Sequence, residues 1–222
     1  MKRTSSVMIA LFVLTSTALH AQRKVNDLSL IYDITVESAG DKPQAAQLFN
    51  GATTTVYIKG NNHRTEMVNS LGQSVTIYNG ATSSAVVLKE YGNQKLLIRM
   101  TPADWKSSNS KFEGIKYTTT SETKTIAGYL CYKATGTMTD GTVFSVFYTK
   151  EIAPENNGYN PQFAGIDGLV LEYSYTAGKM KIVNTASQVR TNTIPPAKFE
   201  IPKSGYREMT YEESRRTGGG GK

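Results

Sequence analysis

Two glycines and an aspartate stand close together in the stretch FAGIDGLVLEYSYT, which covers residues 163–176. A carboxylate in a glycine-built turn is a candidate for acid–base chemistry when a second suitable group stands beside it. Neither a histidine nor a metal-ligand cluster accompanies Asp167 in this stretch. Gly165 and Gly168 instead predict a tight turn with positive φ, in which aspartate bonds its local backbone. We therefore interpret Asp167 as a turn residue that leads into a strand.

One histidine and one cysteine are the other residues that could do nucleophilic or metal chemistry, once residues 1–21 are set aside. His63 stands between Asn62 and Arg64 in a predicted hairpin and is interpreted as a solvated turn residue. The sequence has no G-x-S-x-G motif to give it a serine partner. Cys131 stands among apolar and aromatic residues, which favours a buried small hydrophobe. Zinc sites need clusters of such ligands, so we predict no catalytic residue, no metal and no cofactor.

Paired carboxylates are the remaining route to an enzyme. A glycosidase needs two of them at a defined separation. The acids that could meet in space are Glu66, Asp140, Glu151, Asp167 and Glu172. The 13 tyrosines could supply sugar platforms, but tyrosine is also a good strand former. Phosphate-loop and dinucleotide motifs are absent from the sequence, and we expect that the protein is not an enzyme.

The first residues predict export. Lys2 and Arg3 precede an apolar run from Val7 to Leu14, and small residues follow up to Ala21. This order is typical of a secretory signal peptide cleaved near Ala21. The apolar run is far shorter than the roughly 20 residues that span a bilayer, and no later segment is apolar enough. We expect a periplasmic or secreted protein with no integral membrane segment after signal removal.

The net charge of +7 comes from cations that are scattered along the chain. A nucleic-acid-binding face needs a basic stripe, whereas the mature part of this sequence has only one arginine pair, close to its C-terminus. We therefore expect no nucleic-acid partner.

Strand patterns dominate from residue 27 onward. The stretch LSLIYDITVES alternates apolar and polar residues, which predicts a strand with one face made of Leu28, Leu30, Tyr32, Ile34 and Val36. Strand-forming runs then start about every 10 residues, a spacing typical of an antiparallel meander. In the second half, the Asp-Gly of TDGT predicts a tight hairpin between two long runs. Both runs are apolar on both faces, so we expect them at the centre of the sheet.

Two short helices are predicted. Thr101 is a candidate N-cap for a helix over residues 102–108, with Pro102 in its first turn. Trp105 is expected to pack this helix or loop on the sheet. The second candidate helix covers residues 42–49.

The predicted domain organisation has three parts. Residues 1–21 are the signal peptide, and residues 22–212 form a single β-rich domain. Residues 213–222 are expected to be a disordered tail because they have little to bury.

A twisted antiparallel sheet covered by few helices leaves a concave, partly open apolar surface. Such a surface is suited to an apolar ligand such as an acyl chain. In the alternative arrangement, strands and loops close over a filled core. The residues alone leave both arrangements open.

Several motifs resemble an exported family of unknown function that is common in Bacteroidota. They are KTIAGYLCYKATGTMTDGTVFSVFYTKEI, FAGIDGLVLEYSYTAG and FEIPKSGYREMTYEE, and the resemblance spans residues 28–212. It implies a LolA/LolB-like fold, an open half-barrel of one curved antiparallel sheet with one or two short covering helices. The GIDGLVLEY stretch also looks like the G-L-P-G-L-I motif of a neighbouring exported family, with Asp167 in place of the proline and Val170 in place of the isoleucine.

Two functions follow as hypotheses. The first is a periplasmic binding or carrier protein for an apolar ligand, either a lipid or a lipoprotein acyl chain. Its candidate pocket-lining residues are Tyr32, Ile34, Ile58, Met67, Ile98 and Met100. The second is a non-enzymatic interaction module of a cell-envelope or outer-membrane assembly, which would hold an envelope protein by a sheet edge or by the basic tail.

Overall fold

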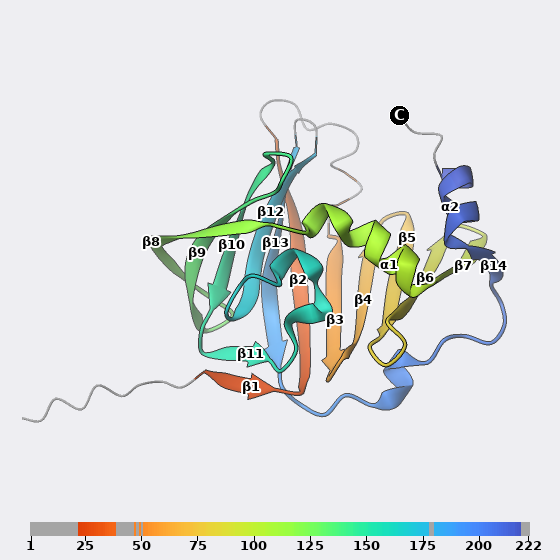
Figure 1. The fold of residues 1–222 in the computed structure, drawn as a ribbon, viewed down its shortest axis with the longest axis horizontal. Coiled ribbons are helices and arrows are strands. Elements are labelled where there is room, and N and C mark those ends of the chain that lie inside the picture. The colour runs from red at the N-terminus through yellow and green to blue at the C-terminus, as the bar shows by residue number, and fades with distance from the viewer. Residues whose placement is uncertain (1–21, 39–46, 48, 50, 178–179, 219–222) are drawn as a thin grey trace, which may run out of the picture.

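The computed structural model describes residues 22–38, 47, 49, 51–177 and 180–218. Within them the chain forms one sheet of twelve strands, a separate pair of short strands and two short α-helices (Figure 1). The predicted fold class, a mainly β protein built on a single curved antiparallel sheet, is confirmed. The predicted signal peptide and nearly all of the predicted helix at residues 42–49 lie outside the described residues.

The large sheet has the spatial order β14-β7-β6-β5-β4-β3-β2-β13-β12-β10-β9-β8. Its neighbours are antiparallel except β14 and β7, which are parallel. Its strands are β2 (Asp27–Ser38), β3 (Thr53–Lys59), β4 (Asn62–Asn69), β5 (Gly72–Asn79), β6 (Ser84–Tyr91), β7 (Gln94–Met100), β8 (Lys116–Ile126), β9 (Tyr129–Thr137), β10 (Val143–Thr149), β12 (Leu169–Ala177), β13 (Met180–Arg190) and β14 (Arg207–Thr210). The small parallel sheet joins β1 (Arg23–Val25) to β11 (Ile152–Pro154).

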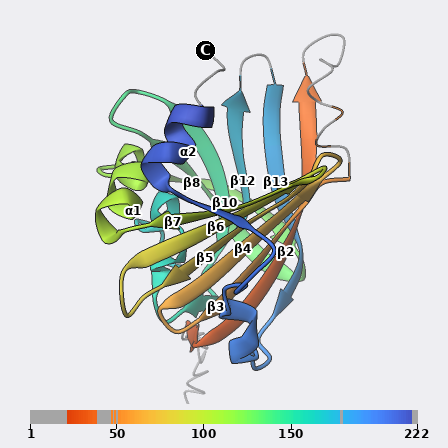
Figure 2. The same cartoon turned by 90° about the vertical axis from the view of Figure 1, so that its right-hand side faces the viewer.

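The sheet has an inner face, on which α1 (Pro102–Asn109) and two 3-10 turns (Asn157–Tyr159 and Pro161–Phe163) lie, and an opposite outer face (Figure 1). Figure 2 shows the strands sweeping around the inner side. Strand pairing aligns the inner-face side chains in three rows across β2 to β7. The rows are Leu28, Ile58, His63, Tyr78, Ala85 and Met100; Leu30, Val56, Thr65, Thr76, Val87 and Ile98; and Tyr32, Thr54, Met67, Ser74, Lys89 and Leu96.

The half of the inner face on β2, β12 and β10 is closed by the chain segment from β11 to β12. Phe163 and Ile166 of this segment belong to the same buried cluster as Leu30 and the inner residues of β12. The rings of Phe163 and Tyr173 meet edge to face with centroids 5.1 Å apart. The buried Tyr32 hydroxyl donates to the Val170 carbonyl at 2.7 Å, which satisfies a polar group that would be costly to bury alone. This half is therefore a filled core.

The outer face of β5, β6 and β7 is covered by the C-terminal segment. The 3-10 turn Pro196–Phe199 is anchored by Arg64, whose Nη1 donates to the Lys198 carbonyl at 3.1 Å. Phe199 and Tyr206 pack on the apolar residues of this face, namely Val75, Ile77, Val86, Leu88 and Leu97. The segment then pairs with the edge strand β7 as β14 and passes from the outer face to the inner side of the sheet.

Both helices have capping boxes, in which a side chain and a backbone N–H exchange hydrogen bonds. In α1, Thr101 Oγ1 accepts from the Asp104 N–H at 3.2 Å, and Asp104 Oδ2 accepts from the Thr101 N–H at 2.9 Å. The helix predicted at residues 102–108 is thus confirmed. Thr210 and Glu213 form the same arrangement at α2 (Tyr211–Gly218). Residues 213–218, predicted as part of a disordered tail, are therefore helical.

The predicted Asp-Gly hairpin is confirmed between β9 and β10, but these strands lie near the β8 edge and not at the centre. Their outer face is covered by long side chains instead of by another layer. Lys124 Nζ lies 4.0 Å from the ring centroid of the buried Phe147, and Lys133 Nζ lies 5.8 Å from it. Lysine stems shield apolar surface while their charged ends stay wet, so apolar runs do not require a central position.

The turn before β12 follows the prediction at one glycine only. Gly168 has a φ of +154°, as a turn glycine can. Gly165 is not among the residues with positive φ. A Cβ at this position would lie 3.0 Å from the Tyr117 ring, so glycine is favoured here because the space is limited and not because of its φ.

Candidate ligand-binding groove

The inner face over β4 to β7, between α1 and α2, is not filled. It contains two neighbouring hollows of about 380 Å³ and about 940 Å³. Val87 and Met100 line the first, and Lys89 and Ile98, each two residues along the same strand, line the second. Residues two apart share a strand face, so the hollows are successive sections of one surface, which we call the inner groove.

Aromatic rings form the first section of the inner groove. The rings of His63 and Tyr78 stack with centroids 4.6 Å apart and planes 14° from parallel. Trp105 of α1 lies over them, 5.0 Å from Tyr78 and 5.8 Å from His63. Trp105 thus packs α1 on the sheet, as predicted. Tyr159 and Tyr211 line the same section from other elements.

His63 is not the solvated turn residue that the sequence suggested. It is only 2% exposed, because it pairs with Ile58 of β3 and so belongs to an inner-face row. Burial lowers the pKa of His63 to about 4, so the imidazole is neutral at neutral pH. Its position makes it part of the groove floor.

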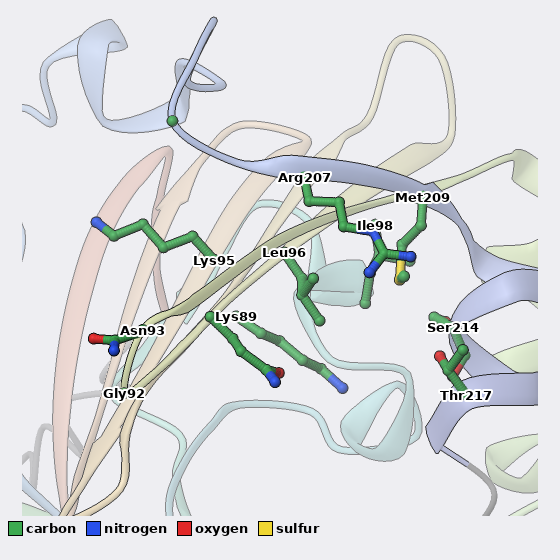
Figure 3. Close-up of a pocket in the computed structure, with 12 residues that line it drawn as sticks. Lys89, Gly92, Asn93, Lys95, Leu96, Ile98, Arg207, Met209, Ser214 and Thr217 are labelled. Carbon is green, nitrogen blue, oxygen red and sulfur yellow. The ribbon is translucent and has the colours of Figure 1, made fainter.

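The second section is walled by the C-terminal elements. Figure 3 shows β14 above Leu96 and Ile98, with Ser214 and Thr217 of α2 facing them. Strand β14 of this wall pairs with β7, where Arg207 lies opposite Leu96 and Met209 lies opposite Ile98. The wall therefore depends on a segment that is distant in sequence from the groove floor.

The second section carries positive charge. Lys89 and Arg207 both line this section, and neither forms an ion pair within the part of the chain that the structure describes. Lys95 also lines this section, but its side chain projects away from them in Figure 3 and forms an ion pair with Glu90 at 2.9 Å.

The six predicted lining residues fall into three groups. Ile98 and Met100 line the inner groove. Met67 is half-buried on the third row. The other three are in closed clusters of the core, namely Tyr32, Ile34 and Ile58. A ligand-binding role for any of the six stays a prediction. Sequence reasoning missed Lys89, although it shares a face with Val87 by alternation, and it missed the whole β14–α2 wall.

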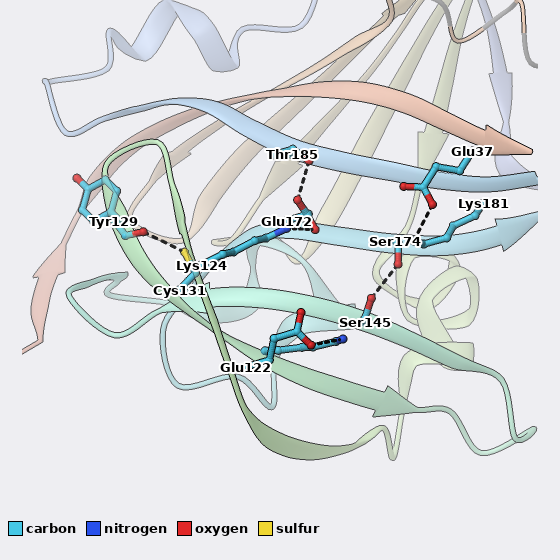
Figure 4. A network of polar contacts seen from close by, with 11 residues as sticks. Glu37, Glu122, Lys124, Tyr129, Cys131, Ser145, Glu172, Ser174, Lys181 and Thr185 are labelled. Atoms are coloured by element: carbon cyan, nitrogen blue, oxygen red, sulfur yellow. Dashed lines mark hydrogen bonds and ion pairs between the residues drawn. The ribbon is translucent and has the colours of Figure 1, made fainter.

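The acids considered for sugar chemistry are engaged separately. Glu172 lies in a polar network on the outer face (Figure 4), where it accepts from Lys124 Nζ at 2.6 Å and from Thr185 Oγ1 at 2.9 Å. The neighbouring Ser145 and Ser174 hydroxyls share a hydrogen bond of 2.9 Å across β10 and β12. This network ties strands together away from the inner groove.

The remaining acids have local partners or none. Glu66 pairs with Arg64 at 2.5 Å. Glu151 and Asp140 each accept a backbone N–H, at 3.1 and 2.8 Å. Asp167 is exposed, and no hydrogen bond to its carboxylate is found within the described residues. These contacts therefore bring no two of the five candidate acids together around one hollow of the described structure.

Cys131 is fully buried, and its Sγ donates to the Tyr129 carbonyl at 3.5 Å. Burial raises the pKa of the thiol to about 11. Within the described residues, no group of three acidic, histidine or cysteine side chains is placed to hold a metal ion, and no helix is long and apolar enough to span a bilayer.

No family model and no curated protein matches the chain. Among solved structures, an uncharacterised conserved protein from Thermus thermophilus has a TM-score of 0.50 at 10% identity, covering 83% of this chain and 91% of that one. PNGF-II has a TM-score of 0.49 at 16% identity, covering 87% of this chain, which spans only 33% of PNGF-II. A LolA superfamily protein from Nitrosomonas europaea has a TM-score of 0.36 at 12% identity, covering 82% and 93%. At 10% identity, the similarity to the Thermus thermophilus protein is one of fold alone.

Proposed function

We propose that the protein is an exported envelope protein that binds or carries an apolar chain in the inner groove. The observation that carries the proposal is the contrast between the two halves of one sheet face. The segment before β12 fills one half, whereas the other half keeps a hollow of about 940 Å³, where Leu96, Ile98 and Met209 supply apolar surface among polar and charged residues. The exported location is supported by the order of residues 1–21.

The groove lining suits a flexible chain. Covering apolar surface contributes about 25 cal/mol for each Å² removed from water. Met100 and Met209 are unbranched side chains that adapt to irregular ligands. The floor also has half-buried hydroxyls at Thr65 and Thr76. This mixed lining favours a chain that carries a polar group over a bare hydrocarbon.

The interaction-module hypothesis now rests on the sheet edge. Residues 207–218 are built into the edge at β7 and into the groove wall, so deleting residues 203–222 would remove the wall as well as the basic tail. That truncation would disturb both proposed functions. The opposite edge strand is β8. It pairs with β9 along one edge, and its other edge pairs with no strand among the described residues. A free strand edge can accept a strand from a partner.

Titration of the delipidated protein tests the proposal. We expect a fluorescent fatty acid to bind with saturation at one site, because the two sections form one continuous surface. Native mass spectrometry of the same sample should show one chain bound per protein. Absence of a bound chain in both measurements would overturn the proposal.

A further inference from the structure

We propose that Lys89 and Arg207 form a subsite for the anionic head of a single-chain amphiphile, with a carboxylate or a phosphate as the head. The amphiphile's own head group, and not free phosphate, is the occupant. This inference rests on the proposed function, since the head subsite requires that the inner groove takes the chain.

Strand register places both cations beside one apolar side chain. Lys89 of β6 pairs with Leu96 of β7 on one side, and Arg207 of β14 pairs with Leu96 on the other. Adjacent strands are about 4.8 Å apart, so the two backbones are about 10 Å apart. Long cationic side chains reach across such a gap to a single anion. In Figure 3 both project to the same side of the sheet as Leu96 and Ile98.

The acids near this section are engaged elsewhere. Glu90 pairs with Lys95 at 2.9 Å, and Glu208 makes two hydrogen bonds to Arg99 at 3.0 Å. By alternation along their strands, both acids belong to the outer face. Glu213 is on the wall side, where its carboxylate caps α2; Arg207 contributes, after this capping, to lowering the pKa of Glu213. Among the residues that the structure describes, no acid lines the second section. The charge of the section is therefore complementary to an anion.

The direction of the chain follows from the same rows. Arg207 is exposed and Lys89 is half-buried, which places the cations at the mouth of the groove. Further along β6 the next inner-face residue is Val87, and the first section beyond it is lined by Trp105 and the neutral His63. An anionic head at the mouth thus leaves its chain directed toward apolar and aromatic surface.

Four amphiphiles with the same chain test the head subsite, namely dodecanoate, dodecyl phosphate, dodecanol and dodecylamine. Isothermal titration of the mature full-length chain should give both anions about tenfold tighter binding than the alcohol, as expected for charge-assisted hydrogen bonds. The double variant Lys89→Gln/Arg207→Gln should reduce the anions to the affinity of dodecanol and leave dodecanol unchanged. Added salt should weaken the binding of the two anions and leave the binding of dodecanol unchanged.

Lys181→Gln is the matched control, because it removes one positive charge at a lysine of β13 that pairs with Glu37 and lines neither section of the inner groove. It should keep the preference for anions. Equal binding of all four amphiphiles, unchanged in the double variant, would overturn the head subsite and leave the proposed function standing. Tighter binding of dodecylamine, or binding of inorganic phosphate as strong as that of dodecyl phosphate, would also overturn it. Absence of binding by all four would overturn both proposals.

Discussion

Replacing Gly168 with alanine is expected to lower the free energy of unfolding by at least about 3 kcal/mol, from backbone strain and overpacking together. The φ of Gly168 is +154°, which side chains rarely adopt. A Cβ there would also lie 2.2 Å from the Thr149 carbonyl oxygen. The backbones of Gly168 and Thr149 cannot shift apart easily, because Thr149 and the following Leu169 are both fully buried. Urea unfolding of the purified variant measures the loss.

Gly128→Ala is the matched control for this prediction. Gly128 also has a positive φ, +85°, but a Cβ there meets nothing within 4 Å. Gly128→Ala should therefore lower the free energy of unfolding by only about 1 kcal/mol, from the unfavourable backbone conformation alone. Similar losses in the two variants would show that close approach to Thr149 contributes nothing.

His63 should make the protein lose stability as the pH falls from 6.5 to 4. The unfolded state takes up a proton near the ordinary pKa of 6.5, while burial holds the folded-state pKa to about 4. The unfolded state thus binds more protons in this window, and stability rises with pH across it. The expected contribution is about 3 kcal/mol over the whole window. Urea unfolding at a series of pH values measures this slope.

His63→Phe keeps an aromatic ring beside Tyr78 and Trp105 but cannot titrate. The difference in unfolding free energy between the wild type and this variant should change by about 3 kcal/mol between pH 6.5 and 4. Tyr78→Phe should retain the wild-type slope, because it leaves the histidine buried. Parallel pH profiles for the wild type and His63→Phe would contradict a buried, neutral His63.

Local sequence signals were sufficient for several elements. Thr101, Pro102 and Asp104 carry the whole start signal of α1 within four residues, and the helix begins there. The alternation in β2 correctly placed Leu28 and Leu30 on one face, and both are buried. The Asp-Gly turn correctly paired β9 with β10. In each case the deciding interactions are between near neighbours in the chain.

The candidate site was harder to predict because its open and closed halves share one pattern. Tyr32 and Ile98 both follow the alternation of an inner face, yet Tyr32 lies in the filled core and Ile98 lines the groove. The difference is that the segment before β12, which is distant in sequence, covers Tyr32 and not Ile98. The alternation within a strand contains no information about such a contact. Two signals were available and missed: the T-x-x-E capping box at Thr210, and the pairing of His63 with Ile58 across the predicted hairpin.

Filling the inner groove tests the central claim most directly. Val87 is half-buried on the groove floor, so phenylalanine at this position should occupy space that the chain needs. Val143→Phe makes the same change at a side chain that is 59% exposed on β10. Thr76→Phe, from the neighbouring strand, is a second filling variant, and thermal unfolding checks that each variant is folded. We expect dodecanoate affinity to fall at least about tenfold in Val87→Phe or Thr76→Phe and to stay at the wild-type value in Val143→Phe. Folded filling variants that bind dodecanoate as tightly as the wild type would contradict binding in the inner groove.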